Sequence, residues 1–301
     1  MNVADFELHR RYLVGVAYRM LGTLAEAEDV VQDAFLRVRD QPPPEHPRAY
    51  LTRVVTRLCL DVLKSAHRQR MTYVGPWLPE PLHDVSDFTG ARAGDDLSDD
   101  LSIGLLYALE RLSPLERAAF LLHDVFGVGF TEIASTLDRS EAACRQLAAR
   151  ARRAVRQSHA PQPARFAVTE ADERAFLQAF LEASQSGDVS VLEALLTRDV
   201  KLHSDGGGKA SAAINILEGR DRVLKFMIGI YQKFRQYTVE SVEFVRANGA
   251  LAVLSYHADG TTDLLTIETV EGRIANVYFI RNPDKMKTFH PPLHSGGGGA
   301  E

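Results

Sequence analysis

The sequence predicts a multidomain protein in which two all-α modules precede an α+β domain. Apolar residues recur at helical spacing up to about Gln157, whereas alternating, strand-like runs appear only after Asp199. Two proline-containing stretches, 73–104 and 158–167, interrupt these patterns and indicate linkers. We therefore expect domains at 1–72, 105–157 and 168–290, followed by a disordered tail at 291–301.

Composition narrows the classes of protein that remain. The 301 residues carry 35 Lys plus Arg and 40 Asp plus Glu, a net charge of −5 that excludes a uniformly basic nucleic-acid coat. Cys59 and Cys144 lie far apart without metal-ligand spacing, so we expect buried thiols and neither a disulfide nor a zinc site. No signal peptide and no run of about 18 apolar residues occurs, which predicts a cytoplasmic protein.

The first module shows two strong helices of opposite charge. Thr23 and Glu26 have capping-box spacing, and a helix is expected from Leu24 to Val38. Pro47 opens a second helix, whose exposed face is basic. Either a solvated charged face or a phosphate-facing surface accounts for these cations. They are Arg53, Arg57, Lys64 and Arg68.

The second module has the pattern of a helix-turn-helix. Ser113 to Glu116 combine a capping box with proline at the first helical position. A short helix over 131–137, a turn at 138–140 and a longer helix over 141–156 follow. Recognition helices place early residues at base edges and later cations near phosphates, and we prefer this assignment to a plain bundle helix. The residues placed to contact DNA are Ser140, Arg145, Gln146, Arg150 and Arg153.

The last domain begins with helices and continues with strands. Helices are expected from Thr169, around 192–196 and up to Phe234. Four strand-like runs then follow with Asn-Gly, Asp-Gly and Glu-Gly turns between them. Helices followed by an antiparallel meander predict an α+β domain.

Three segments in order resemble the two conserved regions of extracytoplasmic-function (ECF) sigma factors of bacterial RNA polymerase, within the sigma-70 family. They are AYRMLGTLAEAEDVVQDAFLRV, HPRAYLTRVVTRLCLDVLKSAHR and LSPLERAAFLLHDVFGVGFTEIASTLDRSEAACRQLAARARRAV. The resemblance implies that the basic helix melts the minus-ten element and that the helix-turn-helix reads the minus-thirty-five element. It also implies polymerase contacts at Asp29, Gln32, Asp33 and Phe35.

Three further motifs resemble those of group 41 within this family, in which a SnoaL-like cone is fused to the sigma regions. WLPEPL lies in the first linker, and DGGGK and NPDKM lie in the last domain. The resemblance implies cis regulation by the cone and no separate anti-sigma factor. The regulatory residues are Trp77, Leu78, Pro79, Glu80, Pro81, Leu82, Asp205, Gly206, Gly207, Gly208, Lys209, Asn282, Pro283, Asp284 and Lys285.

Physical chemistry supports an interface role for the first linker. Trp77 and Leu78 form an apolar pair in an extended, proline-stiffened segment. The alternative is a loop packed locally on its own module. We prefer docking of this pair against the C-terminal domain.

The predicted cone leaves two other classes of function open. His203, Asp205, His257 and Asp263 are candidate acids or bases for an isomerase or cyclase, although we favour structural roles and no catalysis. A repressor with a small ligand in its cone is the other rival. DGGGK is interpreted as a flexible loop, and no cofactor or metal is expected. The main prediction is a sigma factor whose partners are core RNA polymerase and promoter DNA.

Overall fold

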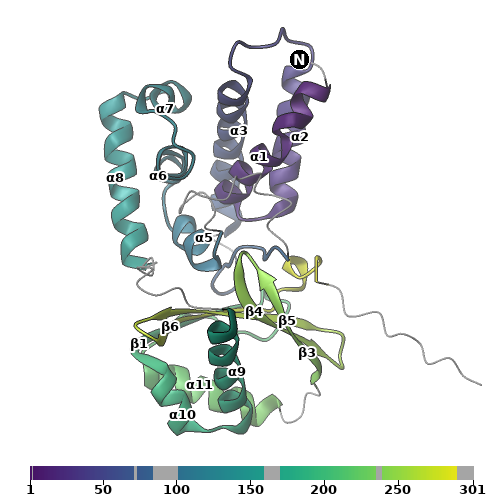
Figure 1. Ribbon diagram of the computed structural model, residues 1–301, viewed down its shortest axis with the longest axis vertical. Helices are drawn as coiled ribbons and strands as arrows, with labels where there is room; N and C mark the ends of the chain where they lie inside the picture. The colour runs from purple at the N-terminus through teal and green to yellow at the C-terminus, as the bar shows by residue number, and fades with distance from the viewer. Residues whose placement is uncertain (2, 71–72, 84–100, 159–169, 235–238, 290–301) are drawn as a thin grey trace, which may run out of the picture.

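A computed structural model describes residues 1, 3–70, 73–83, 101–158, 170–234 and 239–289. The helices of the first two modules form one half of the molecule, and a sheet with three helices forms the other (Figure 1). The acidic stretch at 84–100, most of the second linker and the glycine-rich tail lie outside the described residues.

The first module consists of three helices. They are α1 (Val3–Leu21), α2 (Leu24–Val38) and α3 (Pro47–Arg70). Helix α2 has the predicted bounds, but the predicted capping box is wrong because the Thr23 side chain caps no backbone amide. Its hydroxyl donates instead to the Glu26 carboxylate at 2.6 Å.

The second module has the predicted helix-turn-helix. Its elements are α5 (Ile103–Glu110), α6 (Pro114–Phe120), a π-helix η1 (Leu121–Val125), α7 (Phe130–Leu137) and α8 (Glu141–Ser158). The capping box of Ser113 and Glu116 is confirmed. Asp138 takes a left-handed conformation with φ of 53°, which ends α7 and turns the chain toward α8.

The two helical modules share one continuous apolar core, which runs from Met1 to Val155. Arg117 of α6 is 3% exposed, and its guanidinium donates to the carbonyl of Met20 in α1 at 2.6 Å and pairs with Glu110 at 3.0 Å. Cys59 and Cys144 are free and buried in this core, as predicted. The modules are therefore packed together and not merely tethered.

The last domain is an α+β cone with a six-stranded sheet of order β2-β1-β6-β5-β4-β3. Its helices are α9 (Glu170–Ser186), α10 (Val189–Leu195) and α11 (Arg220–Phe234), with a 3-10 turn η2 (Pro283–Lys285). The strands are β1 (Leu196–Asp205), β2 (Leu217–Glu218), β3 (Val239–Ala247), β4 (Ala250–His257), β5 (Thr262–Val270) and β6 (Arg273–Ile280). The meander β3 to β6 was predicted, whereas β1, which runs parallel to β6, was not.

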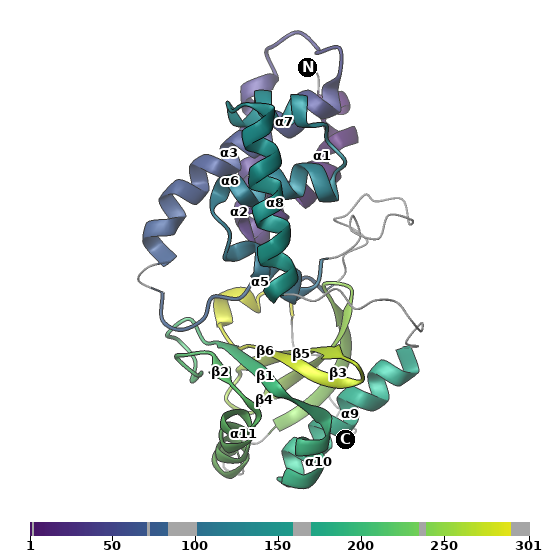
Figure 2. The same cartoon turned by 90° about the vertical axis from the view of Figure 1, so that its left-hand side faces the viewer.

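Side chains alternate along each strand and therefore point to two faces of the sheet. Both faces are covered. The inner face packs on α9, α10 and α11 through residues such as Leu202, Val253 and Val277. The outer face packs on the first linker and on α5, and Leu254 and Tyr278 are among its buried side chains. Figure 2 shows the three helices below the sheet and α5 above it.

Candidate functional site

Helix α8 presents the predicted recognition surface to solvent. Arg145, Gln146, Arg150 and Arg153 are exposed, and Ser140 Oγ accepts a hydrogen bond from the Ala143 amide at 3.2 Å. Two of these cations are held by carboxylates. Arg145 pairs with Glu141 at 2.8 Å, and Arg150 pairs with Glu116 at 2.8 Å. Surface pairs of this kind contribute little to stability.

The acidic face of α2 is also exposed. Asp29, Gln32 and Asp33 point to solvent, while Phe35 is half-buried and packs on Phe6 with ring centroids 5.1 Å apart. Phe35 therefore fixes α2 on α1 in this arrangement and leaves its polar neighbours accessible.

The predicted cations of α3 lie in different surroundings. Arg53 lies 5.5 Å from the Tyr50 ring, and Lys64 pairs with Asp61 at 2.9 Å. Arg57 is exposed but also contacts α7 of the second module. Its Nε donates to the Thr136 carbonyl at 3.0 Å, and its Nη2 donates to the Ser135 carbonyl at 2.8 Å. The side chain of Arg68 lies outside the described part of α3.

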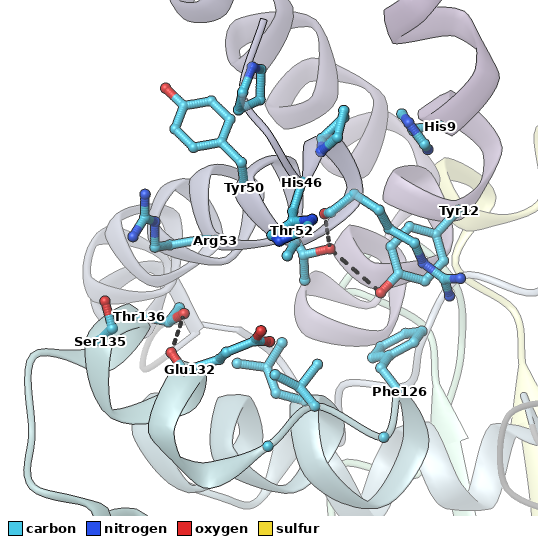
Figure 3. Close-up of a pocket in the computed structure, with 18 of the residues that line it drawn as sticks. His9, Tyr12, His46, Tyr50, Thr52, Arg53, Phe126, Glu132, Ser135 and Thr136 are labelled. Carbon is cyan, nitrogen blue, oxygen red and sulfur yellow. Dashed lines mark hydrogen bonds between the residues drawn. The ribbon is translucent and has the colours of Figure 1, made fainter.

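A groove of about 900 Å³ opens beside this contact, between the start of α3 and the segment from Leu122 to Thr136. Tyr12, His46, Arg53 and Phe126 line it from the two modules (Figure 3). We call the Arg57 contact with its adjoining groove the seam. The seam brings the predicted minus-ten surface against the helix-turn-helix.

A buried ion pair within the cone binds the first linker. Asp205, at the end of β1, is fully buried, and its carboxylate accepts from the Leu78 amide at 2.8 Å and the Tyr73 hydroxyl at 2.5 Å. Lys285 is 5% exposed and lies 2.6 Å from the same carboxylate. Its ammonium also donates to the Leu78 carbonyl and lies 4.0 Å from the centroid of the Trp77 ring. We call these five residues the clamp.

The environment of the clamp keeps its tyrosine protonated. Burial, followed by the hydrogen bond to the Asp205 carboxylate, raises the pKa of Tyr73 well above its ordinary value. Tyr73 therefore stays a neutral donor to Asp205. Its hydroxyl in turn accepts from the Asn282 amide at 2.8 Å, which ties the NPDKM segment to the linker.

The glycines after Asp205, where a flexible loop was expected, form a tight turn. A Cβ at Gly206 would lie 2.2 Å from the Ala210 carbonyl oxygen, and one at Gly207 would lie 2.3 Å from Asn282 Nδ2. Gly207 also has φ of 59°, which favours glycine. Only glycine lets the backbone approach this closely. Lys209 pairs with Asp284 at 2.5 Å on the surface, where a salt bridge contributes little.

Trp77 and Leu78 are covered by different partners. Leu78 is buried against the outer face of the sheet, in agreement with docking on the cone. The Trp77 ring lies over Gly22 of the first module, since a Cβ at Gly22 would come within 2.5 Å of it. The linker is therefore wedged between the cone and the first module.

Glu80 caps helix α2 from outside the helix. Its carboxylate accepts from the Leu24 amide at 2.9 Å, and its carbonyl accepts from the Tyr18 hydroxyl at 2.6 Å. Burial raises the pKa of Glu80 above its usual value. The same linker that holds the cone thus completes the N-terminus of the predicted polymerase-binding helix.

Sequence reasoning did not single out Tyr73, Tyr18 or Asn248, which all take part in this interface. Asn248, in the β3–β4 turn with φ of 54°, donates from Nδ2 to the Tyr18 hydroxyl at 2.8 Å, and its Oδ1 accepts from the Leu82 amide at 2.8 Å. The Asn-Gly dipeptide predicts a turn and carries no signal of a partner 230 residues away.

The outer face of the sheet also holds His203, one of the candidate acids or bases for which a structural role was favoured. His203 is 2% exposed and lies between the Tyr107 ring of α5, at 4.7 Å, and the Tyr278 ring, at 5.0 Å. Burial lowers the pKa of His203 to about 4, so the imidazole is neutral near pH 7. Its setting is that of a packed interface residue.

Within the described part of the chain, no helix combines the length and apolar composition needed to cross a bilayer. Those residues also contain no cluster of three or more His, Cys, Asp or Glu side chains placed to hold a metal ion.

Comparison with known families matches all three parts. Residues 6–69 match sigma-70 region 2, residues 103–155 match sigma-70 region 4, and residues 177–286 match the SnoaL-like domain.

Relatives cover nearly the whole chain. The ECF RNA polymerase sigma factor SigJ of Mycobacterium tuberculosis is 38% identical over 300 residues, covering 95% of this chain and 93% of the relative. The probable ECF RNA polymerase sigma factor SigI of the same species is 32% identical, covering 98% and 97%. The crystal structure of Mycobacterium tuberculosis SigJ aligns with a TM-score of 0.74 and 34% identity, covering 95% and 99% of the two chains.

Proposed function

Since the chain belongs to the ECF RNA polymerase sigma factors with a C-terminal SnoaL-like domain, we propose that the clamp lets this domain control how the two sigma regions are spaced. Promoter-specific initiation of transcription is the function of the family. The single observation that supports our proposal is that the buried Asp205–Lys285 pair of the cone binds the backbone of Leu78, in the linker between the two regions.

We assign the partners as follows. The exposed face of α2, with Asp29, Gln32 and Asp33, binds core RNA polymerase, with Phe35 holding the helix in place. The cations of α3 contact the minus-ten element, and α8 contacts the minus-thirty-five element through Arg145 and Gln146 at bases and Arg150 and Arg153 at phosphates. Promoter recognition by this protein takes place in the cytoplasm, where bacterial RNA polymerase acts.

The compact arrangement is incompatible with simultaneous reading of both elements on straight DNA. Their names place them about 25 base pairs apart, or roughly 85 Å at 3.4 Å per base pair. Arg57 of α3 instead lies within hydrogen-bond distance of α7. We therefore assign this arrangement to a closed state, whose seam has to open before the promoter is bound.

The cone takes the place of a separate anti-sigma factor and has no catalytic activity in this proposal. Both oxygens of Asp263 are engaged, Oδ2 with His257 Nε2 at 2.5 Å and Oδ1 with Arg281 Nε at 2.7 Å. These contacts support a structural role for Asp263.

The test is in vitro transcription with purified core polymerase and the full chain carrying Asp205→Asn. This change removes the clamp charge, and we expect promoter binding by the free protein and transcription to rise several-fold. Asp284→Asn is the matched control, because its pair with Lys209 is exposed. Equal transcription and equal DNA binding for wild type and Asp205→Asn would overturn the regulatory proposal.

The site assignments have separate tests in the same assay. Arg145→Ala is expected to weaken promoter selection at its base by about tenfold, corresponding to 1–3 kcal/mol per good base contact. Asp33→Ala is expected to weaken binding of core polymerase and to leave specificity intact. A repressor would bind its site equally well without polymerase, which separates that rival from a sigma factor.

A further inference from the structure

The cone contains an apolar cavity of about 580 Å³ on the inner face of its sheet. Phe180 from α9, Phe226 from α11 and Phe279 from β6 contribute aromatic walls, and Val253 and Leu265 extend them along the sheet. This volume lies in the range that accommodates small organic ligands. The clamp and the groove of the seam lie outside this cavity.

One end of the cavity is polar and tightly organised. Ser255 and His257 line it from β4, and Asp263 lines it from β5. His257 and Asp263 are 5% and 4% exposed. A mostly apolar cavity with a few converging polar groups suits a ligand that is largely hydrocarbon and has one hydrogen-bonding end.

A continuous set of contacts leads from this polar end to the clamp. The His257 imidazole contacts Asp263, and Asp263 accepts from Arg281. The Arg281 guanidinium also donates to the carbonyl of Ser211, just beyond DGGGK, at 2.5 Å. Its backbone amide donates to the Asp205 carbonyl at 2.8 Å. Asp205 is the residue on which the clamp is built.

The sheet provides a second connection, because the same strands form both sites. On β4, Val253 and Ser255 face the cavity, whereas Leu254 and Tyr256 belong to the outer-face cluster that contains Leu78. A ligand that displaces β4 or β5 on the inner face therefore acts on the linker through the thickness of one sheet.

We propose that the cone cavity binds an uncharged, largely apolar small molecule with a carbonyl or hydroxyl group, and that the chain His257–Asp263–Arg281 transmits its binding to the clamp. This inference rests on the proposed regulatory function. Glu240 at the rim of the cavity is exposed, and its negative charge opposes the entry of anions. The Asp263 charge is already paired internally, so it does not select a cation.

The test uses prodan, an uncharged naphthyl ketone whose emission reports an apolar environment, and the full-length protein. We expect saturable binding of one prodan per chain with blue-shifted emission. Hydrogen exchange of the segment 76–83 then reports the clamp, since the Leu78 amide donates to Asp205. Prodan is expected to change its exchange rate about fivefold or more, the lower end of allosteric couplings.

Variants separate binding from transmission. Val242→Phe places a larger side chain at the cavity wall and is expected to weaken prodan binding about tenfold. Arg281→Met is expected to retain prodan binding and to lose the response of residues 76–83. Arg273→Met, an exposed arginine at the start of β6, is the matched control and keeps both.

Each outcome decides the proposal. Absence of saturable prodan binding overturns the site, and binding with unchanged exchange at 76–83, or an unaltered response in Arg281→Met, overturns the coupling. Failure of the proposed regulatory function is detected by a different experiment, since transcription with Asp205→Asn tests the clamp in the absence of any ligand.

Discussion

The clamp and the seam hold parts of the molecule together by different chemistry. At the clamp, Asp205 and Lys285 are both almost fully buried and satisfied by several partners. At the seam, the exposed Arg57 side chain donates to two backbone carbonyls beside an open groove. Buried charge pairs are costly to break, whereas exposed contacts exchange readily with water.

From this difference we infer that the seam, and not the clamp, is the contact that opens. In our proposal, the cone stays attached to the linker while the seam opens and closes, and the clamp sets the position from which opening starts. The shared core between α1 and α6 opposes full separation, because Arg117 is buried against the Met20 carbonyl.

The largest effect is expected when the clamp loses one charge. Lys285→Met leaves the buried Asp205 carboxylate without its cation and is expected to lower the free energy of unfolding by about 3–5 kcal/mol. Urea denaturation of the variant and the wild type measures this difference in unfolding free energy. The double variant Asp205→Asn with Lys285→Met should recover part of the loss, and the exposed Lys287→Met should change almost nothing. An equal loss in Lys285→Met and Lys287→Met would show that the buried pair of the clamp stabilises the fold no more than an exposed lysine does.

The free energy of unfolding is expected to depend on pH through His203, in the interface next to the clamp. The pKa of His203 is about 4 in the folded state and about 6.5 when unfolded, so the unfolded chain binds the additional proton between these values. The His203 contribution is complete above about pH 6.5. It falls as pH falls and is lost below about pH 4, a total of about 3 kcal/mol.

His203→Phe is the comparison for this effect, because it preserves an aromatic ring between Tyr107 and Tyr278. Its unfolding free energy, measured from pH 7 to 4.5, should fall less steeply than that of the wild type. Parallel curves would show that His203 titrates normally and that the interface is open to water.

A smaller effect is expected at the end of the linker that caps α2. Glu80→Ala removes the acceptor of the Leu24 amide and should cost about 1 kcal/mol of stability. Core polymerase binding should weaken as the first turn of α2 frays. Glu28→Ala on the exposed face of the same helix is the control for stability, and matching losses in the two variants would refute the capping role.

The smallest effect is expected at the seam. Arg57→Ala removes two exposed hydrogen bonds and should cost less than about 1 kcal/mol. Amide exchange in α7 should accelerate by less than about fivefold, while exchange at residues 76–83 stays unchanged. Lys64→Ala, on the same helix and away from α7, should leave both segments unaffected. A loss as large as that of Lys285→Met would invert the comparison.

Local pattern predicted much of the fold. The period of Ala27, Val30 and Val31 located α2, and Ser113 with Glu116 located the start of α6, because helical faces and caps depend on residues within one or two turns. Strand β1 was not predicted, since its partner β6 lies more than seventy residues later and a parallel pair has no turn signal between its strands.

The sequence motifs predicted which segments form the candidate site, but not which residues contact one another within it. WLPEPL, DGGGK and NPDKM indicated an interface, but spacing could not show that Asp205 pairs with Lys285 or that Glu80 caps a different module. Asn248 carried only a turn signal, and Gly206 and Gly207 suggested flexibility where close packing requires them. Tertiary partners, which local sequence does not encode, decide these roles.

The order of the clamp residues along the chain has a consequence for biosynthesis. Leu78 and the helix-turn-helix leave the ribosome well before Lys285, and at 5–20 residues per second the interval is on the order of ten seconds. During that time the nascent sigma regions have no cone to restrain them, and Leu78 has no covering sheet. Each new molecule thus passes through an unrestrained period before its own C-terminal domain folds over the linker.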